Sequence, residues 1–368
     1  YHLIFIVKIK IIMKVCILGS GLTSLTLAKT LVNQGIYVDI FLSKSNSDKD
    51  KTRTIGISKT NIDFFNKYIL NIEKLLWDIN KIEIYSENFK NEKILNFQNS
   101  NDKLFSILKN FELFDYLYSK LIKDKLCTFK KDSITNSLLK KNYDLFINCD
   151  FSNSITKKFF QRQIKKNYNS FALTSTIKHK KVKNKTALQI FTSKGPLAFL
   201  PISKNETSVV YSIRGEQQTD LNYFIKKYNK FYEITKFGQV KSFYLKSSNL
   251  RSYYHKNVLA FGDLLHKLHP LAGQGFNMTI RDIREILNLI KLRKNNGLAL
   301  DSSVCEDFEK NLRHKNIIFS SGIDFIYEFF NLESKMKNQI LSRSVKFLGK
   351  NKLVNNFFTN IADNGLII

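Results

Sequence analysis

Two glycines near the start of the chain have the spacing of a phosphate-binding turn. Gly19, Gly21 and Ser24 occupy the three positions of a G-x-G-x-x-G pattern between an apolar run and a helical pattern. The first position gives the turn backbone freedom, the second lets a pyrophosphate approach the backbone, and the third sets how closely helix and strand pack. The helix that follows offers free N–H groups and a partial positive charge to phosphate. Because Ser24 is not glycine, an ordinary tight turn remains the alternative to a dinucleotide site.

A second set of residues has the chemistry to bind a flat ring and a polyol. Gly262 and Asp263 end an apolar run, at the position where ligands bind in open α/β sheets, and the carboxylate of Asp263 can accept hydrogen bonds from a polyol. A loop and a helix follow, with Pro270, Gly273, Gln274, Gly275 and Asn277. The backbone of such a loop can lie against a planar ring. The positive end of the helix favours negative charge that the ring gains on reduction.

The strands that must position these residues are those of an α/β protein. Residues 14–42 have a strand, helix, strand pattern, and residues 143–150 and 257–263 form two further apolar strands. Strand patterns also occupy residues 81–97 and 170–213. We therefore expect strands to crowd the middle of the chain and βαβ units to lie towards its ends.

Helical periods fill much of the remaining sequence. A helix is predicted over residues 103–122, another over 277–292, and an amphipathic helical region from about residue 302. The segment 52–68 is predicted to be a turn that enters a helix. In the last region, aromatic residues are interpreted as helix core rather than as a quinone groove, the other reading of Phe319, Phe325, Phe329 and Phe330.

The composition is that of a folded and strongly basic chain. Its 368 residues are 43% hydrophobic and 13% aromatic, which excludes a disordered protein. The net charge is +28, yet only nine of the 59 basic residues are Arg, the residue favoured for phosphate and base recognition. The lysines are scattered and no nucleic-acid-binding motif occurs, so we interpret the charge as a solvated surface and expect no nucleic-acid partner. The four cysteines lack zinc or disulfide spacing, which favours a reducing compartment.

The segment before Met13 is apolar but does not have the features of a membrane span. Residues 1–12 contain Lys8 and Lys10 and fall short of the ~20 residues that a spanning helix needs. They also lack the small-residue cleavage site of a signal peptide. Because Met13 stands directly before the first strand, we expect residues 1–12 to be an upstream extension.

The segment 261–283 resembles the signature of the ubiquinone-biosynthesis FAD-dependent aromatic-ring hydroxylase family (UbiH/UbiF/VisC type). The matching residues, in order and spacing, are Gly262, Asp263, His266, His269, Pro270, Gly273, Gln274, Gly275, Asn277 and Asp282. Three further segments are similar to the same family: TRTIGIS with Arg53, KGPLAFLPIS at 194–203, and FEKNLRHKNIIF at 308–319. The resemblance therefore covers nearly all of residues 13–368.

This resemblance implies a fold and a domain organisation. The expected fold is α/β, with a Rossmann-like FAD-binding domain, an inserted mixed β-sheet substrate domain and a C-terminal helical segment. The FAD-binding domain is expected to be discontinuous, with residues 13–75, 100–160 and 250–295. The substrate domain is expected over 76–99 and 161–249, and the helical region over 296–368.

The resemblance also implies the residues that bind the cofactor. By similarity, the turn at Gly19 and Gly21 and the helix after it hold the FAD pyrophosphate, Asp263 holds the ribityl chain, and Gly273 to Asn277 hold the isoalloxazine. Arg53 is similar to a family arginine near the cofactor, although it could equally be a surface residue. The full expected set is Gly19, Gly21, Ser24, Arg53, Gly262, Asp263, Pro270, Gly273, Gln274, Gly275 and Asn277.

The implied reaction is the hydroxylation of an aromatic ring. FAD would be reduced by NAD(P)H and would react with O₂ to a flavin hydroperoxide, which transfers one oxygen to a polyprenylated phenol or quinone precursor of ubiquinone. The implied partners are this lipid-soluble precursor, O₂, an anionic membrane surface and other quinone-biosynthesis enzymes. The expected location is cytoplasmic, with peripheral attachment to the inner membrane.

Three departures from the family pattern define an alternative. Ser24 replaces a glycine, Leu42 stands where the family has a ribose-binding Glu, and Phe151 follows Asp150 where the family has a Gly. Asp39 lies in the second strand, where side chains alternate in direction, and need not face a ligand. The alternative is a degenerate paralogue that acts as a scaffold in a quinone-biosynthesis complex.

Two histidines in the signature raise the question of a metal. His266 and His269 lie three residues apart, but no carboxylate or third histidine is near them in sequence. We therefore expect no metal site. No residue is identifiable as a general base, so no catalytic residue is assigned.

Overall fold

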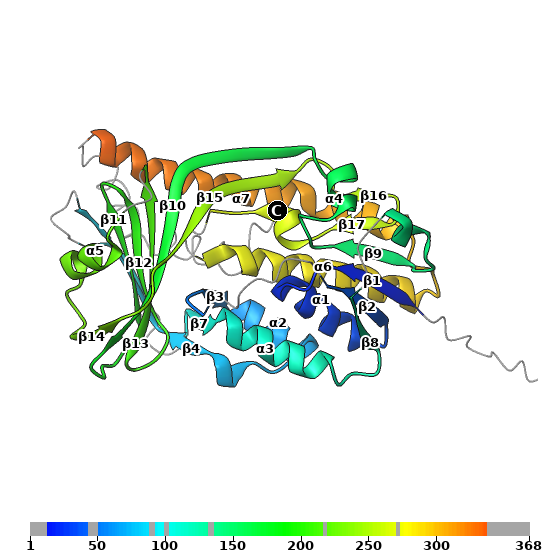
Figure 1. Ribbon diagram of the computed structural model, residues 1–368, viewed down its shortest axis with the longest axis horizontal. Helices are drawn as coiled ribbons and strands as arrows, with labels where there is room; N and C mark the ends of the chain where they lie inside the picture. Colours follow the sequence, from blue (N-terminus) through cyan, green and yellow to red (C-terminus); the bar gives the residue numbers. More distant parts are fainter. Residues whose placement is uncertain are drawn as a thin grey trace, which may run out of the picture.

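A computed structural model describes residues 13–42, 51–87, 93–98, 103–131, 136–215, 219–269 and 273–336. Figure 1 shows an α/β part at one end of the molecule and a large sheet at the other, with two long helices running between them. The expected fold class is confirmed: a Rossmann-like part, a mixed β-sheet part and a C-terminal helix are all present. None of the described helices is long and apolar enough to cross a bilayer.

The α/β part is built on a six-stranded sheet. Its strand order is β16-β17-β9-β1-β2-β8. The strands are β1 (Lys14–Leu18), β2 (Tyr37–Phe41), β8 (Cys127–Lys130), β9 (Leu145–Asn148), β16 (Tyr254–His255) and β17 (Val258–Ala260). All neighbours are parallel except β16 and β17. The carboxyl ends of β1, β9 and β17 therefore meet at one edge, where a ligand can contact all three.

A larger mixed sheet forms the other end of the molecule. Its main order is β18-β15-β10-β13-β12-β11-β5-β6, with β14 on β10. The strands are β5 (Lys81–Ser86), β6 (Lys93–Gln98), β10 (Gln163–His179), β11 (Thr186–Thr192), β12 (Gly195–Pro201), β13 (Glu206–Arg214), β14 (Ile234–Phe237), β15 (Lys241–Leu250) and β18 (His266–Lys267). The strands predicted over 81–97 and 170–213 are confirmed.

A third sheet of three strands lies between the two parts, and here two local predictions are wrong. It contains β3 (Thr54–Ser58), β4 (Trp77–Ile79) and β7 (Phe105–Lys109), in the order β3-β7-β4. The helix predicted over 103–122 begins only at Asn110, and the segment 52–68 contains a strand before its helix. The reason is tertiary pairing: β7 bonds to β3 on one side and β4 on the other, which overrides a short apolar pattern that fits helix or strand equally.

The helices connect these sheets and cover them. They are α1 (Leu22–Val32), α2 (Lys59–Tyr68), α3 (Asn110–Leu121), α4 (Ser154–Phe159), α5 (Leu221–Tyr228), α6 (Gln274–Asn295) and α7 (Ser302–Met336). Short 3-10 turns are η1 (Glu73–Leu75), η3 (Asn136–Lys140) and η4 (Gly262–Leu264). The helix predicted over 277–292 is α6. The helix predicted from about residue 302 is α7, and the last residues of that prediction lie outside the described chain.

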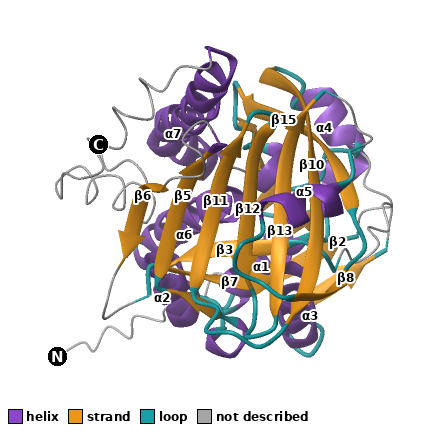
Figure 2. Ribbon diagram, turned by 90° about the vertical axis from the view of Figure 1, so that its left-hand side faces the viewer, coloured by secondary structure: helices purple, strands orange, loops and turns teal. Residues whose placement is uncertain are grey.

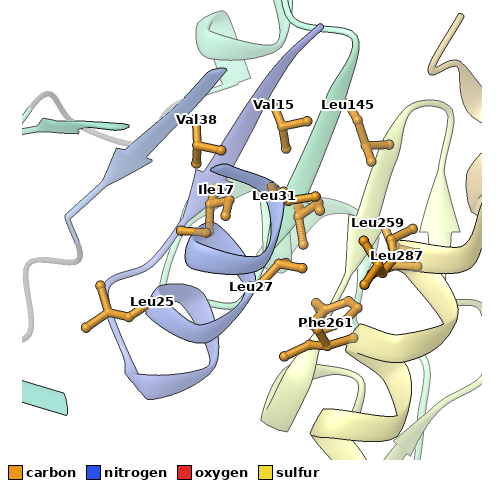
Figure 3. Close-up of a cluster of buried hydrophobic side chains, with 14 of the residues drawn as sticks. Val15, Ile17, Leu25, Leu27, Leu31, Val38, Leu145, Leu259, Phe261 and Leu287 are labelled. Atoms are coloured by element: carbon orange, nitrogen blue, oxygen red, sulfur yellow. The ribbon is translucent and has the colours of Figure 1, made fainter. Parts of the chain in front are cut away.

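The largest core lies between the six-stranded sheet and helices α1 and α6. Figure 3 shows Val38, Val15 and Leu145 side by side on neighbouring strands, with Leu31 of α1 against them and Leu287 of α6 nearby. These side chains are essentially inaccessible to solvent. Burial of each contributes about 1.5–3 kcal/mol, so this core fixes the strand ends that form the site.

The two faces of the large sheet are covered differently. On one face, α5 packs its buried side chains Leu221, Ile225 and Tyr228 against the strands (Figure 2). The opposite face contacts α7 through Phe319, Ile323 and Tyr327 and α6 through Met278. Of the aromatic residues expected in the last helix core, Phe319 is buried but Phe325 is 68% exposed, so the core interpretation is wrong for Phe325.

Candidate functional site

The β1–α1 turn meets the ends of β9 and β17 as the strand order requires. Gly19 has φ +107, and a Cβ there would lie 3.3 Å from Cβ of Asp150 after β9. Gly262 after β17 has φ +63, and a Cβ there would lie 2.6 Å from Cγ2 of Thr23 in α1. Both positions therefore need glycine for conformation and for close approach. The first half of the predicted cofactor set is thereby brought to one edge of the sheet.

Gly21 has no such structural reason to be glycine. Its backbone is extended, with φ −75 and ψ 176, and no described atom lies within 4 Å of a Cβ built on it. It is the N-cap of α1, and no side chain caps this helix. The open space in front of uncapped helix N–H groups is what a pyrophosphate needs. The cradle thus fits a dinucleotide cofactor by a feature that the protein's own packing does not explain.

The side chain of Ser24 points into the protein, below this turn. Ser24 is fully buried, and its hydroxyl interacts with the thiol of Cys149 at the end of β9. Burial raises the pKa of Cys149 to about 12, which keeps this thiol protonated. A serine is therefore tolerated where the pattern has glycine, because it packs against β9 rather than into the cofactor space.

Asp263 lies at the same edge and is available to a ligand. It is exposed in η4, directly after β17. Its charge acts on Cys149 and on His266, which places it beside the β9 end. Among the residues that the structure describes, none forms a hydrogen bond with its carboxylate. The predicted role, holding a ribityl chain, remains a prediction that this position supports.

The second half of the predicted set lies where α6 begins. Gly273 has φ +63, and a Cβ there would lie 3.5 Å from the backbone N of Gly56 in β3. Gln274 and Gly275 open the helix and are partly exposed. Pro270 lies outside the described residues. The structure thus places the start of α6 against β3, between the two large sheets.

The side chain of Asn277 is fully used by contacts within the protein. Its Oδ1 accepts hydrogen bonds from the backbone N–H of Ser58 and from Nδ2 of Asn61, both at 3.0 Å. Its own Nδ2 donates to the carbonyl oxygen of Gly56 at 3.0 Å. Asn277 is 2% exposed. Its amide therefore ties the start of α6 to β3 and α2, and only its backbone can face a ring.

A buried ion pair lies beneath the Asp263 turn. His266 Nε2 is hydrogen-bonded to Asp282 of α6, and both side chains are essentially inaccessible. Asn316 of α7 donates to the other carboxylate oxygen at 3.3 Å. Burial lowers the pKa of His266, but the Asp282 carboxylate raises it by more, so the net pKa lies above its usual value. These residues, recognised only as signature positions from sequence, join the Asp263 turn, α6 and α7.

His269 lies in an aromatic cluster between the large sheet and α7. Its ring is 4.8 Å from the ring of Tyr168 in β10 and 4.1 Å from that of Tyr327 in α7. Tyr327 OH is 3.0 Å from Ser170 Oγ and accepts a hydrogen bond from Arg214 Nε at 3.0 Å. No group of three metal-ligating side chains occurs in the described part of the chain. The two tyrosines are too far from His269 in sequence for motif reasoning to have found them.

The burial of His269 predicts a loss of stability in mild acid. Burial first, then Arg214 and Lys166, lower its pKa to about 3. The unfolded chain has an ordinary histidine pKa of about 6.5, so it binds a proton below that pH while the folded chain does not. We expect the free energy of unfolding to fall from pH 6.5 downwards, by at most about 1.4 kcal/mol per pH unit from this group. Denaturant titrations of wild type and His269→Gln between pH 7.5 and 4.5 measure it.

The control for this prediction is an exposed histidine on α7. His314→Gln should retain the wild-type slope, and His269→Gln should flatten it. A slope that is the same in all three proteins would show that His269 does not carry the acid sensitivity.

Arg53 stands exposed just before β3. Its guanidinium lies 5.8 Å from the ring of Phe243 in β15. The neighbouring Thr52 and Thr54 bond to Thr174 and Ser208 of the large sheet, at 3.0 and 3.1 Å. Arg53 thus lies at the junction of the two parts, and its contact with the cofactor remains a prediction.

The departures from the family pattern have structural explanations. Asp39 is buried in β2, accepts a hydrogen bond from Tyr143 OH at 2.6 Å and pairs with Lys14 at 3.1 Å, so it does not replace the missing ribose ligand. Leu42 ends β2 and offers no polar group. Phe151 is 45% exposed and is not among the described residues with positive φ. Its turn is held by the Asp150 carboxylate, which accepts from the Ser152 N–H at 2.8 Å.

Comparison with curated proteins supports the resemblance seen in the signature. No protein-family model matches the chain. The mitochondrial ubiquinone biosynthesis monooxygenase COQ6 of Schizosaccharomyces pombe is 23% identical over 273 residues, which are 60% of this chain and 57% of that protein. The 3-demethoxyubiquinol 3-hydroxylase of Escherichia coli is 29% identical over 154 residues, 39% of each chain. Ubiquinone hydroxylase UbiL of Rhodospirillum rubrum is 23% identical and covers 45% of this chain and 41% of its own.

The chain spans about half the length of the curated relatives it matches. These relatives are named as enzymes, so they give no support to the scaffold alternative. They confirm the predicted resemblance to ubiquinone-biosynthesis hydroxylases.

Comparison with solved structures establishes the fold. The p-nitrophenol 4-monooxygenase PnpA of Pseudomonas putida superposes with a TM-score of 0.78 at 12% identity, over 97% of this chain and 99% of its own. PqsL of Pseudomonas aeruginosa, a probable FAD-dependent monooxygenase, gives 0.70 at 16% identity, over 90% and 99%. 2-Methyl-3-hydroxypyridine-5-carboxylic acid oxygenase gives 0.69 at 12% identity, over 91% and 96%. The fold is that of FAD-dependent aromatic monooxygenases.

Proposed function

From its similarity to ubiquinone-biosynthesis hydroxylases, we propose that this chain is an FAD-dependent monooxygenase. Its substrate would be the aromatic ring of a polyprenylated phenol or quinone precursor in ubiquinone biosynthesis, with NAD(P)H and O₂ as co-substrates. The observation that carries the proposal is the open cradle at Gly21, where the fold leaves space before uncapped N–H groups that its own packing does not need.

The proposed binding residues follow the edge of the six-stranded sheet and the start of α6. The N–H groups at the start of α1 would bind the pyrophosphate, and Asp263 the ribityl hydroxyls. Backbone groups from Gly273 to Asn277, together with the positive end of α6, would face the ring. When bound, FAD supplies hydride acceptance and oxygen activation.

The protein's own contribution is to position the ring and to exclude water. Asn277 fixes the start of α6 against β3, and the His266–Asp282 pair fixes the turn that carries Asp263. The face of the large sheet opposite α5 is closed at one end by α7, whose Phe319 and Tyr327 are buried there. Such a dry, fixed environment protects reactive oxygen chemistry from water. No described residue is assigned as a proton acceptor.

The proposal extends to partners and location. The precursor is lipid-soluble, so we propose peripheral contact with an anionic membrane surface and with other quinone-biosynthesis enzymes. A cytoplasmic chain attached to the inner membrane is the proposed location.

The test is cofactor binding followed by turnover. We expect the purified protein to bind FAD with a flavin absorption spectrum. We also expect it to oxidise NAD(P)H in step with the addition of one oxygen to a prenylated phenol, measured by mass spectrometry. Protein that binds no FAD at saturating concentration would refute the enzyme. FAD binding without ring hydroxylation of any tested precursor would refute the substrate class.

A further inference from the structure

The outer edge of the large sheet is open beside Arg53. β15 pairs with β10 along most of its length. On its other side it pairs with β18 only at Ser248 and Asn249, within the part of the chain that the structure describes. Residues 241–247 therefore form an unprotected strand edge, on which Phe243 is 36% exposed and Tyr244 37% exposed.

Printed distances join these side chains into one patch. The Arg53 guanidinium lies 5.8 Å from the Phe243 ring, and the Lys246 ammonium lies 5.0 Å from the Tyr244 ring. Lys241 is the first residue of the same strand. We call Arg53, Lys241, Phe243, Tyr244 and Lys246 the β15 edge patch. It combines exposed aromatic rings with positive charge at the junction where β3 meets the large sheet.

The charge around this patch has one sign. From residue 234 to residue 262 the sequence contains Lys236, Lys241, Lys246, Arg251 and Lys256 and no acidic residue. Aromatic side chains with one polar end favour the boundary between water and lipid. Lysines can extend their stems over apolar surface and keep the ammonium at anionic headgroups.

Lysines on an open edge have another use. They discourage edge-to-edge pairing of strands between molecules. Exposed Phe243 and Tyr244 do not serve that purpose, because apolar side chains on an open edge promote association rather than prevent it. The combination of rings and lysines is therefore better explained by a partner that is both apolar and anionic.

We propose that the β15 edge patch is the surface by which this protein docks on an anionic lipid bilayer. Docking there places Arg53, and the junction between β3 and the large sheet, next to the lipid. The importance of this orientation for substrate entry rests on the proposed function, but the docking itself does not. A ring dissolved in the bilayer would then reach the site without crossing water.

The test compares two matched double variants in vesicle binding. Tyr244→Ser with Lys246→Glu alters the patch. Tyr223→Ser with Lys226→Glu makes the same changes on α5, where Tyr223 is 58% exposed. Binding is measured by co-sedimentation with phosphatidylcholine vesicles that contain about 30% phosphatidylglycerol, and with phosphatidylcholine alone. We expect at least tenfold weaker binding for the β15 variant and less than twofold for the α5 variant, with wild-type binding weakened by salt.

Several results would overturn the proposal. Equal weakening in the two variants would mean that charge anywhere on the surface suffices. Wild-type binding that ignores lipid charge and salt would exclude an anionic bilayer, and retention of the β15 variant only by a protein partner would do the same. Lys241→Glu with Lys246→Glu keeps both rings and should also lose tenfold, so a folding defect from loss of Tyr244 cannot decide the outcome.

Failure of this inference can be separated from failure of the proposed function. FAD affinity and hydroxylation of a short, water-soluble phenol are measured on the same β15 variants, without vesicles. We expect both to stay within twofold of wild type. Vesicle binding by a protein that takes up no FAD would refute the enzyme and leave the docking surface intact.

Discussion

Replacement of Asp282 with Ala is expected to lower the free energy of unfolding by about 3–5 kcal/mol, because it leaves the charge of His266 buried without its partner. Asp282 is inaccessible to solvent and also accepts a hydrogen bond from Asn316. A loss of this size is a large part of the 5–15 kcal/mol that stabilises a typical protein. Denaturant unfolding followed by circular dichroism measures it.

The control lies on the same helix. Glu285 accepts a hydrogen bond from Asn311 at 2.7 Å, in an exposed position, so Glu285→Ala should cost less than about 1 kcal/mol. If both variants lose the same stability, the buried pair has no special role.

The pH dependence of this loss has a definite sign. The net pKa of His266 is raised, although burial alone would lower it, because the Asp282 carboxylate favours the charged ring. The stability that the pair contributes is therefore complete below about pH 6.5 and is lost as pH rises through the raised pKa. The difference between wild type and Asp282→Ala should accordingly shrink in alkaline buffer.

Replacement of Gly21 with Ser is expected to weaken FAD binding by about 100-fold while leaving the apo protein at least as stable. The extended backbone at Gly21 suits any residue, and nothing described lies within 4 Å of an added Cβ. Serine is a favoured helix N-cap, so it should stabilise α1 by a few tenths of a kcal/mol. It would also fill the cradle and take an N–H group from the pyrophosphate. Loss of one or two charge-assisted hydrogen bonds, at about 1.5–3 kcal/mol each, accounts for 100-fold.

FAD titration followed by flavin fluorescence, together with thermal unfolding of the apo protein, measures both effects. Gly322→Ser is the matched control, because Gly322 of α7 also has open space around an added Cβ but lies outside the predicted site. It should leave FAD affinity unchanged. Wild-type affinity in Gly21→Ser would show that no phosphate occupies this cradle.

The parts of the fold that could be predicted from sequence are those set by local pattern. The parallel strands at 14–18, 145–148 and 258–260 were recognisable because a buried parallel strand is a short apolar run. The ligand edge followed, because glycines and an acid stand at the ends of those runs. β7 was not recognisable, because only its pairing with β3 and β4 makes residues 105–109 a strand.

The predicted site was incomplete for a similar reason. Glycine spacing identified the turns, but it could not show that the Asn277 amide is turned towards β3 and α2. Nor could it show that His269 meets Tyr168 and Tyr327, which lie about 100 and 60 residues away in the chain. Contacts of this kind depend on how the sheets and α7 assemble. Sequence therefore located the cofactor edge better than the surroundings of the ring.

The length of β10 restricts how the molecule can move. This single strand runs from Gln163 to His179, bonds to β15 throughout and to β13 beyond a bulge, and bends at Asn169, which has φ +47 (Figure 1). A hinge between the α/β part and the large sheet would have to break this ladder. Large-scale closure of one lobe on the other is thus excluded as a way to admit and enclose a substrate. Adaptation to a bulky prenylated ring must come from side chains and short loops, on timescales faster than lobe rotation.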